Sequence, residues 1–200
     1  SQDFFQTDHK APISCFVTEF FPVGLGVATG SLDKTIKLWQ KKDDNEPFEL
    51  ADTLEGHNTA ISALCGDSSN LFSGSEDGEI RLWQKCPNKK CFISKLTIQA
   101  HEAKVTSLEP SSPKDPKTLF SGASDGSIKL FEGDNFAEAH VEKSVHSREI
   151  TSLKFKKFGG LLFSGSRDGS FAVWKKSGQG LTPLIKVQEC ATPILSVFPD

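Results

Sequence analysis

One phrase recurs four times along the chain, as "ATGSLDKTIKLWQ" at residues 28–40, "FSGSEDGEIRLWQ" at 72–84, "FSGASDGSIKLFE" at 120–132 and "FSGSRDGSFAVWK" at 163–175. The glycine at the third position of each copy is Gly30, Gly74, Gly122 or Gly165, so neighbouring copies are 44, 48 and 43 residues apart. A period of this length is typical of an array in which each repeat is one four-stranded propeller blade. The phrase therefore predicts an all-β protein.

Each phrase has the pattern of two strands joined by a tight turn. Three copies have Asp-Gly at the turn, a dipeptide that tolerates positive φ angles, whereas the first has the weaker turn former Asp33-Lys34. Apolar and polar residues then alternate, which indicates a strand. The strand ends in a large ring that we expect to be buried between neighbouring sheets, namely Trp39, Trp83, Phe131 or Trp174.

A second phrase keeps step with the first. It carries an apolar anchor at intervals of 48, 44, 45 and 44 residues, at Ile13, Ile61, Val105, Ile150 and Ile194. A histidine stands four residues before each of the first four anchors, at His9, His57, His101 and His146, and Cys190 has that position before the fifth. Only His140 is out of phase, so the other four histidines have one shared role in the repeat.

Together the two phrases resemble the WD repeats, over nearly the whole chain. In that family a His, a Ser or Thr, an Asp and a Trp form a hydrogen-bonded network in each blade. The resemblance implies three complete sets, which are His9, Thr29, Asp33, Trp39; His57, Ser73, Asp77, Trp83; and His146, Ser164, Asp168, Trp174. The third set has His101, Ser121 and Asp125 but ends in Phe131, which has no indole N–H, so we expect one bond fewer there.

Two features depart from the family pattern. Only Gly56-His57 keeps the Gly-His pair, and the Asp that usually follows the Trp is replaced by Gln40, Gln84, Glu132 or Lys175. The Trp-Asp-x-Arg feature associated with a cullin adaptor is absent after all four rings. This counts against that class of ubiquitin ligase.

The repeats predict four blades plus the first strand of a fifth. The expected repeats are 6–54, 55–98, 99–143 and 144–188, and residues 189–200 begin a further one. WD-repeat propellers usually have seven blades, and an open fan would expose two apolar sheet faces. We expect this chain to be part of a larger propeller, with the remaining blades from further chain, from a second polypeptide or from a paired fan.

Composition indicates an intracellular module of the cytoplasm or nucleus. No apolar run approaches 18 residues, and the first residues lack the pattern of a signal peptide. The five cysteines are an odd number, and Cys15, Cys65 and Cys190 fall at or beside predicted strands, so we expect reduced core thiols.

Several kinds of chemistry compete with a structural role for these residues. The His, Ser and Asp sets contain the residue types of a hydrolase triad, but a nucleophilic site is built once and these sets recur in every repeat. Cys86 and Cys91 are half of a zinc site without a second pair, and no glycine-rich phosphate loop precedes a helix. We therefore predict no catalytic residue, no metal and no cofactor.

The basic pairs are scattered and the net charge is −3, so nucleic acid is not indicated as a partner, and neither is a membrane.

The remaining surface is the ring of loops that a propeller presents. In the family, partners often contact the residue before the turn Asp and the residues just after the His. By position these candidates are Leu32, Glu76, Ser124 and Arg167, and then Lys10, Pro12, Asn58, Ala60, Glu102, Lys104, Ser147 and Glu149. Their mixed chemistry suits a protein or peptide partner.

Three functions remain open at this level. The first is a non-catalytic scaffold for protein–protein interaction. The alternative is the substrate-recruiting domain of a larger enzyme, such as a ubiquitin ligase or an atypical kinase, with catalysis outside this sequence. The third, an RNA-associated assembly subunit, requires basic surface that this sequence lacks.

Overall fold

The computed structural model describes residues 8–18, 26–41, 43, 46–66, 70–86, 91–111, 118–142, 146–178, 180–188 and 192–197. The chain divides into two compact units, Ser1–Gln99 and Ala100–Asp200. The described residues contain strands and turns, and no helix among them is long and apolar enough to cross a membrane.

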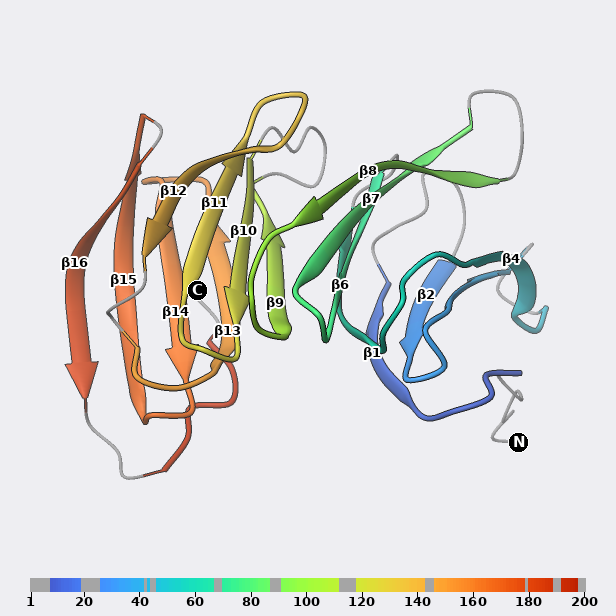
Figure 1. Cartoon of the computed structure of the whole chain (residues 1–200), viewed down its shortest axis with the longest axis horizontal. Helices are drawn as coiled ribbons and strands as arrows, with labels where there is room; N and C mark the ends of the chain where they lie inside the picture. The colour runs from blue at the N-terminus through green and yellow to red at the C-terminus, as the bar shows by residue number, and fades with distance from the viewer. Residues whose placement is uncertain are drawn as a thin grey trace. The chain divides into compact units, whose positions relative to one another are not determined.

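Unit one contains two four-stranded sheets (Figure 1). Sheet one consists of β1 (Ile13–Val17), β2 (Gly26–Ser31), β3 (Ile36–Gln40) and β4 (Glu49–Leu54). Sheet two consists of β5 (Ile61–Gly66), β6 (Asn70–Ser75), β7 (Glu79–Lys85) and β8 (Phe92–Gln99).

Unit two contains the other two sheets. Sheet three consists of β9 (Val105–Pro110), β10 (Thr118–Ala123), β11 (Ile128–Glu132) and β12 (Ala137–Glu142). Sheet four consists of β13 (Ile150–Lys156), β14 (Leu161–Ser166), β15 (Ser170–Ser177) and β16 (Gly180–Gln188). In every sheet the strands pair antiparallel in chain order, so the expectation of an all-β chain with four four-stranded sheets is confirmed.

The recurring phrase folds as the second and third strands of each sheet and the turn between them. In three turns a glycine has a φ of 83°, 84° or 80°, at Gly78, Gly126 and Gly169. Its amide donates to the carbonyl three residues earlier, as in Gly78 N to Ser75 O at 3.2 Å. Lys34 adopts the same conformation with a φ of 72°, which is unfavourable for a residue that has a Cβ.

The two sheets of unit one pack through a shared apolar core. Trp83 and Ile61 of sheet two lie against Leu38 and Leu54 of sheet one, and all four are at most 4% exposed. The anchor Ile61 fits over Gly30, where an added Cβ would lie only 2.6 Å from Ile61 Cγ2. Glycine recurs at this position because the anchor of the next sheet takes the space of a side chain.

Unit two repeats this packing. Trp174 and Leu162 of sheet four lie against Phe120 and Leu130 of sheet three, and all are fully buried. Ile150 fits over Gly122 at a distance of 2.5 Å from an added Cβ. The prediction that the terminal rings are buried between sheets therefore holds for Trp83 and Trp174.

Hydroxyl groups also link neighbouring sheets within each unit. In each unit the residue after the first anchor donates to the anchor carbonyl of the second sheet, as Ser14 Oγ does to Ile61 O and Thr106 Oγ1 to Ile150 O, both at 2.5 Å. The sequence comparison of the repeats did not single out these residues, although a Ser or Thr follows each of the first four anchors.

Residues 192–197 lie on sheet four where the first strand of a further sheet is expected. Ile194 lies over Gly165, its amide donates to Ser166 O at 3.0 Å, and its carbonyl accepts from Thr151 Oγ1. The segment is not a strand, because it joins no strand ladder among the described residues. It nevertheless repeats the contacts that Ile61 and Ile150 make.

Candidate functional site

The turn end of each sheet joins the two sets of candidate partner-binding residues. In every sheet the residue before the turn Asp donates its amide to the carbonyl of the residue before the anchor. The four bonds are Leu32 N to Pro12 O at 3.0 Å, Glu76 N to Ala60 O at 3.1 Å, Ser124 N to Lys104 O at 2.9 Å and Arg167 N to Glu149 O at 2.9 Å. The backbone thus holds these positions side by side, whatever their side chains.

Most of these side chains are accessible to a partner. Eight are exposed, namely Lys10, Pro12, Leu32, Asn58, Glu76, Glu102, Ser147 and Arg167, and Lys104, Ser124 and Glu149 are half-buried. Ala60 is the exception, because it is only 9% exposed and belongs to the core. Arg167 and Glu149 form an ion pair, with Nε 2.6 Å from Oε2.

Sheet one has the predicted network. Trp39 Nε1 donates to Thr29 Oγ1 at 2.8 Å, and His9 Nε2 lies 2.9 Å from the same oxygen. On the other side of the ring lies the Asp33 carboxylate, and because an ionised carboxylate can only accept, His9 Nδ1 carries the ring proton. That nitrogen lies 2.8 Å from Asp33 Oδ2 and donates to it.

Sheet four places a serine between the histidine and the aspartate. His146 Nδ1 lies 2.8 Å from Ser170 Oγ, which donates to Asp168, while the direct distance from His146 Nδ1 to Asp168 Oδ1 is 3.7 Å. Trp174 Nε1 and His146 Nε2 meet at Ser164 Oγ, at 2.9 and 2.8 Å.

Sheet three has the same relay through Ser127. His101 Nδ1 lies 2.9 Å from Ser127 Oγ, which donates to Asp125 at 2.6 Å. His101 Nε2 contacts Ser121 Oγ at 2.7 Å, and Phe131 is buried at 1% exposure without a donor for that oxygen.

Sheet two departs from the predicted set, because no hydrogen bond joins His57 to Asp77. Trp83 and His57 do meet at Ser73 Oγ, at 2.8 and 2.7 Å. His57 Nδ1 instead lies 3.0 Å from Glu79 Oε1, without the alignment of a hydrogen bond. The reason is steric and electrostatic, since Glu79 occupies the position that a short hydroxyl residue has in the other sheets.

An arginine balances this glutamate, whose side chain is 12% exposed. Arg81 Nε donates to Glu79 Oε1 at 2.5 Å, and a Cβ on Gly56 would lie 2.3 Å from Arg81 Nη1. The single Gly-His pair of the chain therefore stands where the Arg81 side chain needs the space.

Sequence reasoning missed the residue two positions after each turn Asp. These residues are Thr35, Glu79, Ser127 and Ser170, and each contacts the Nδ1 side of its histidine. Their fixed place in the recurring phrase was the available signal.

Burial shifts the titration of the buried histidines. It lowers the pKa of His57 to about 4 against the attraction of Glu79, and it lowers the pKa of His101 to about 4 as well. Burial also lowers the pKa of His146, against the attraction of Asp168. Burial alone raises the pKa of Asp33, but hydrogen bonds from Thr35, His9 and Lys10 lower it well below its usual range. The buried histidines are thus neutral and the aspartates charged at neutral pH.

These sets do not have the properties of a nucleophilic site. The oxygens of Ser73 and Ser164 are each committed to a tryptophan and a histidine, and both serines are 0% exposed. A substrate cannot reach them, so the geometry favours a structural role.

Among the described residues, the cysteines and carboxylates show no arrangement typical of a metal site. No group of three or more His, Cys, Asp or Glu side chains converges among the residues that the structure describes. Cys86 N donates to Cys91 O at 2.9 Å across the β7–β8 hairpin, and neither cysteine is in a disulfide. Cys15 and Cys65 are at least half-buried and form no disulfide, and Cys190 lies outside the described residues.

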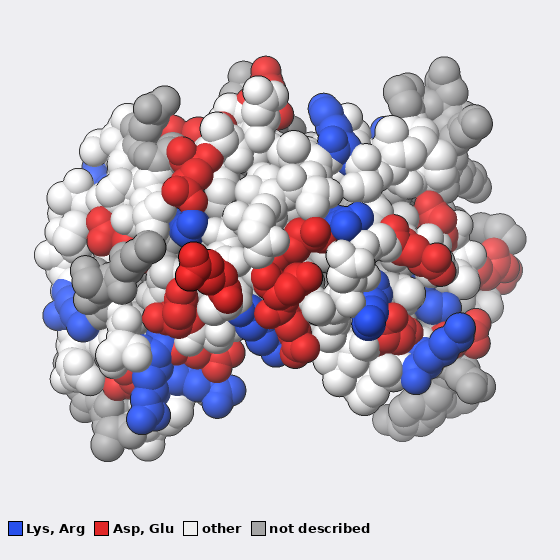
Figure 2. Space-filling view, viewed as in Figure 1, with Lys and Arg blue, Asp and Glu red and all other residues white. Residues whose placement is uncertain are grey.

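Charges of both signs stand side by side on the face of the molecule in Figure 2. Several lysines pair with glutamates, as in Lys129 with Glu138 at 2.5 Å and Lys176 with Glu132 at 2.6 Å. In these pairs the lysine charge is balanced by a carboxylate within the chain.

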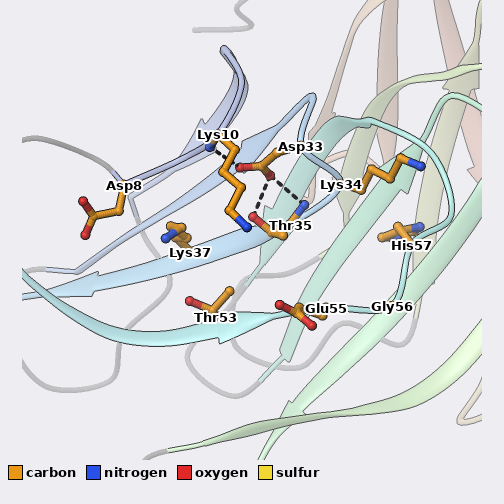
Figure 3. Close-up of a pocket in the computed structure, with 10 residues that line it drawn as sticks. All are labelled: Asp8, Lys10, Asp33, Lys34, Thr35, Lys37, Thr53, Glu55, Gly56 and His57. Atoms are coloured by element: carbon orange, nitrogen blue, oxygen red, sulfur yellow. Dashed lines mark hydrogen bonds between the residues drawn. The ribbon is translucent and has the colours of Figure 1, made fainter.

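Unit one has a hollow of about 510 Å³ at the turn end of sheet one (Figure 3). It is lined by the segment before β1, the β2–β3 turn, β3, the end of β4 and the linker to β5. The lining residues are Asp8, Lys10, Asp33, Lys34, Thr35, Lys37, Thr53, Glu55, Gly56 and His57. Lys10 is the one residue of the candidate partner-binding set in this lining.

Comparison with known families gives a match over most of the chain. The sequence profile described as "WD domain, G-beta repeat" matches four times, at residues 2–40, 48–84, 92–132 and 140–175. No curated protein matches the chain in sequence.

Solved structures resemble the chain in fold. A chain of the Mitotic Checkpoint Complex has 21% identity and a TM-score of 0.77, over 96% of this chain and 56% of that one. The computationally designed Ika8 protein has 26% identity and a TM-score of 0.74, over 96% and 54%. Chaetomium thermophilum Sqt1, bound to the N-terminus of the ribosomal protein L10, has 18% identity and a TM-score of 0.75, over 90% and 50%. The chain spans about half the length of these structures.

Proposed function

The chain belongs to the family of the WD domain, G-beta repeat, and on that premise we propose that it is a non-catalytic scaffold for protein–protein interaction. WD domains are generally interaction modules. We also propose the repeat boundaries 6–54, 55–98, 99–143 and 144–188, with a further repeat from residue 189, and an intracellular location, which is consistent with described cysteines that form no disulfide.

One observation carries this proposal, which is the backbone bond that recurs at the turn end of all four sheets. It holds two positions of each repeat side by side, while the sequence varies them freely between Leu32, Glu76, Ser124 and Arg167. A rigid frame with variable exposed residues is the arrangement by which loops on a scaffold acquire specificity. Two of the similar structures are complexes with proteins or peptides, which supports a partner of that class.

Further blades are part of the proposal. Ile13 and Phe16 of β1 are 41% and 68% exposed, whereas the equivalent Ile150 and Leu153 of β13 are at most 2% exposed under sheet three. The first sheet thus presents an apolar edge of the kind that another sheet covers in this chain. We propose that the remaining blades come from the rest of the chain or from a second chain.

The test is quantitative affinity capture with the full-length protein. We expect Glu76→Arg and Arg167→Glu to reduce the recovery of bound proteins severalfold, because both side chains are exposed at the turn end. Phe158→Ser is the matched control, because Phe158 is 89% exposed in the turn at the opposite end of sheet four. Unchanged recovery with the first two variants and loss with the control would refute this choice of surface. A catalytic domain elsewhere in the full-length protein would favour the alternative function, the substrate-recruiting domain of an enzyme, over the scaffold.

A further inference from the structure

Two cysteines face each other across the β7–β8 hairpin of sheet two. Cys86 directly follows β7 and Cys91 directly precedes β8. Cys86 N donates to Cys91 O at 2.9 Å, and the last pair of the ladder before them is Lys85 opposite Phe92. The strand register therefore places Cys86 directly opposite Cys91.

This placement meets the backbone requirement of a disulfide. Directly opposite residues that are hydrogen-bonded in an antiparallel pair have Cα atoms about 5.5 Å apart, and their side chains stand on the same face of the sheet. A disulfide joins residues whose Cα atoms are about 4.4–6.8 Å apart. The two cysteines can thus be joined without moving either strand.

The backbone beside the two cysteines is held in place. Phe92 N donates to Asp52 Oδ2 of sheet one at 3.2 Å, and the Phe92 side chain packs against the apolar core of unit one. Pairing with Phe92 holds Lys85 at the end of β7. The separation of the two cysteines is therefore fixed by the fold, which favours bond formation between them over bonds to more distant thiols.

The other described cysteines have no such arrangement in their ladders. Cys15 lies opposite Gly30 in the β1–β2 ladder, and Cys65 lies opposite Phe72 in the β5–β6 ladder. Both cysteines of the β7–β8 hairpin are half-exposed, whereas Cys65 is buried. A small oxidant can thus reach the hairpin pair from solvent.

The hairpin pair lies away from the turn end, where the partner surface is proposed. The β6–β7 turn with Gly78 precedes β7, and the cysteines lie beyond the other end of this seven-residue strand, about 20 Å away (Figure 1). A chemical change at the hairpin therefore does not compete with a partner for the same surface.

We propose that Cys86 and Cys91 are a redox-sensitive pair that forms a reversible cross-strand disulfide, with a small disulfide such as glutathione disulfide as the oxidant. The thiolate of one cysteine attacks a glutathione sulfur and displaces one glutathione thiolate, which leaves a mixed disulfide. The second cysteine then attacks the protein sulfur of that mixed disulfide and displaces the second glutathione. Two electrons pass to the oxidant, and the two thiol protons end on the two glutathione molecules. This inference goes beyond the proposed scaffold function and does not depend on it.

Tryptic mapping of the native full-length protein tests the inference. The protein is equilibrated in glutathione buffers of increasing oxidised-to-reduced ratio, quenched with acid, alkylated and digested. Trypsin cleaves after Lys89 and Lys90, so the two cysteines fall in separate peptides unless a disulfide joins them. We expect the joined peptides to appear as the ratio rises and to separate again when dithiothreitol is added.

Single variants identify the bond. Cys86→Ser and Cys91→Ser should each abolish the joined peptides and leave the remaining cysteine as a mixed disulfide with glutathione. Cys15→Ser is the matched control and should leave the joined peptides unchanged. In the parent protein, oxidation should slow hydrogen exchange of the Cys86 amide severalfold, because the disulfide prevents the local strand separation that opens its bond to Cys91.

Three results would overturn the inference. They are mixed disulfides on both hairpin cysteines without joined peptides, joined peptides that form only in urea, and equal cross-linking among all the cysteines. The capture experiment at the turn end is read independently, so a failure here leaves that result standing.

Discussion

Two glycines of unit two have nearly the same backbone conformation in very different surroundings. Gly126 has a φ of 84° and Gly133 a φ of 77°. An added Cβ on Gly126 would lie 2.4 Å from His146 O and 2.9 Å from Arg148 O, whereas one on Gly133 meets nothing within 4 Å. The substitutions Gly126→Ala and Gly133→Ala therefore separate backbone strain from steric exclusion.

The magnitudes follow from these contacts. Left-handed strain of about 1–2 kcal/mol is partly offset by about 0.4–1 kcal/mol from the stiffer unfolded chain, so Gly133→Ala should lose about 1 kcal/mol. Gly126→Ala must also push the backbone of residues 146–148 away. That segment is held by Ser147 N to Asp168 at 2.8 Å and Ser166 Oγ to Arg148 O at 3.1 Å. Weakening two bonds of about 1 kcal/mol each raises the expected loss to about 3 kcal/mol.

Urea unfolding of the two variants and the parent protein measures the difference. We expect the midpoint to fall about three times as far for Gly126→Ala as for Gly133→Ala, with the denaturant slope unchanged. Gly178→Ala is a second control, because Gly178 has a φ of 57° and open space around it. Equal losses for Gly126→Ala and Gly133→Ala would refute the claim that the turn of sheet three packs against the histidine segment of sheet four.

Three further predictions concern the buried networks. His146→Ala should lower the free energy of unfolding in urea by about 1–3 kcal/mol, because Ser164 and Ser170 lose their hydrogen-bond partner on the imidazole ring. His140→Ala removes only a half-exposed contact with Glu142 and should cost less. An equal loss for the two variants would contradict the shared role of the in-phase histidines. Phe131→Trp should gain about 1 kcal/mol by donating to Ser121 Oγ, as Trp174 does to Ser164, and a loss in thermal unfolding would show that the wider ring overpacks the core. The free energy of unfolding should fall as the pH falls from 7 to 5, because His101 has a pKa of about 4 in the folded protein and takes up a proton near its ordinary pKa of 6.5 in the unfolded chain. This one residue accounts for a loss of about 2 kcal/mol over that range. A urea midpoint that does not change between pH 7 and pH 5 would contradict this prediction.

The repeated phrases alone were sufficient to predict the all-β class, the four sheets and the turn positions. These depend on short-range physics, namely alternation along a strand and the φ preference of Asp-Gly at Gly78, Gly126 and Gly169. The contacts of His9 with Thr29 and of Trp174 with Ser164 also follow from positions that keep a constant offset in each repeat.

Only the tertiary structure decided how each histidine reaches its aspartate. That contact is direct at His9, runs through Ser127 and Ser170 in unit two, and is replaced by Glu79 in sheet two. The same holds for the burial of Ala60, the space that Arg81 takes beside Gly56 and the hollow around Lys34. The physical reason is distance. His9 and Asp33 are 24 residues apart and His101 and Ser127 are 26 residues apart, and alternation along one strand does not specify which side chains of distant segments meet.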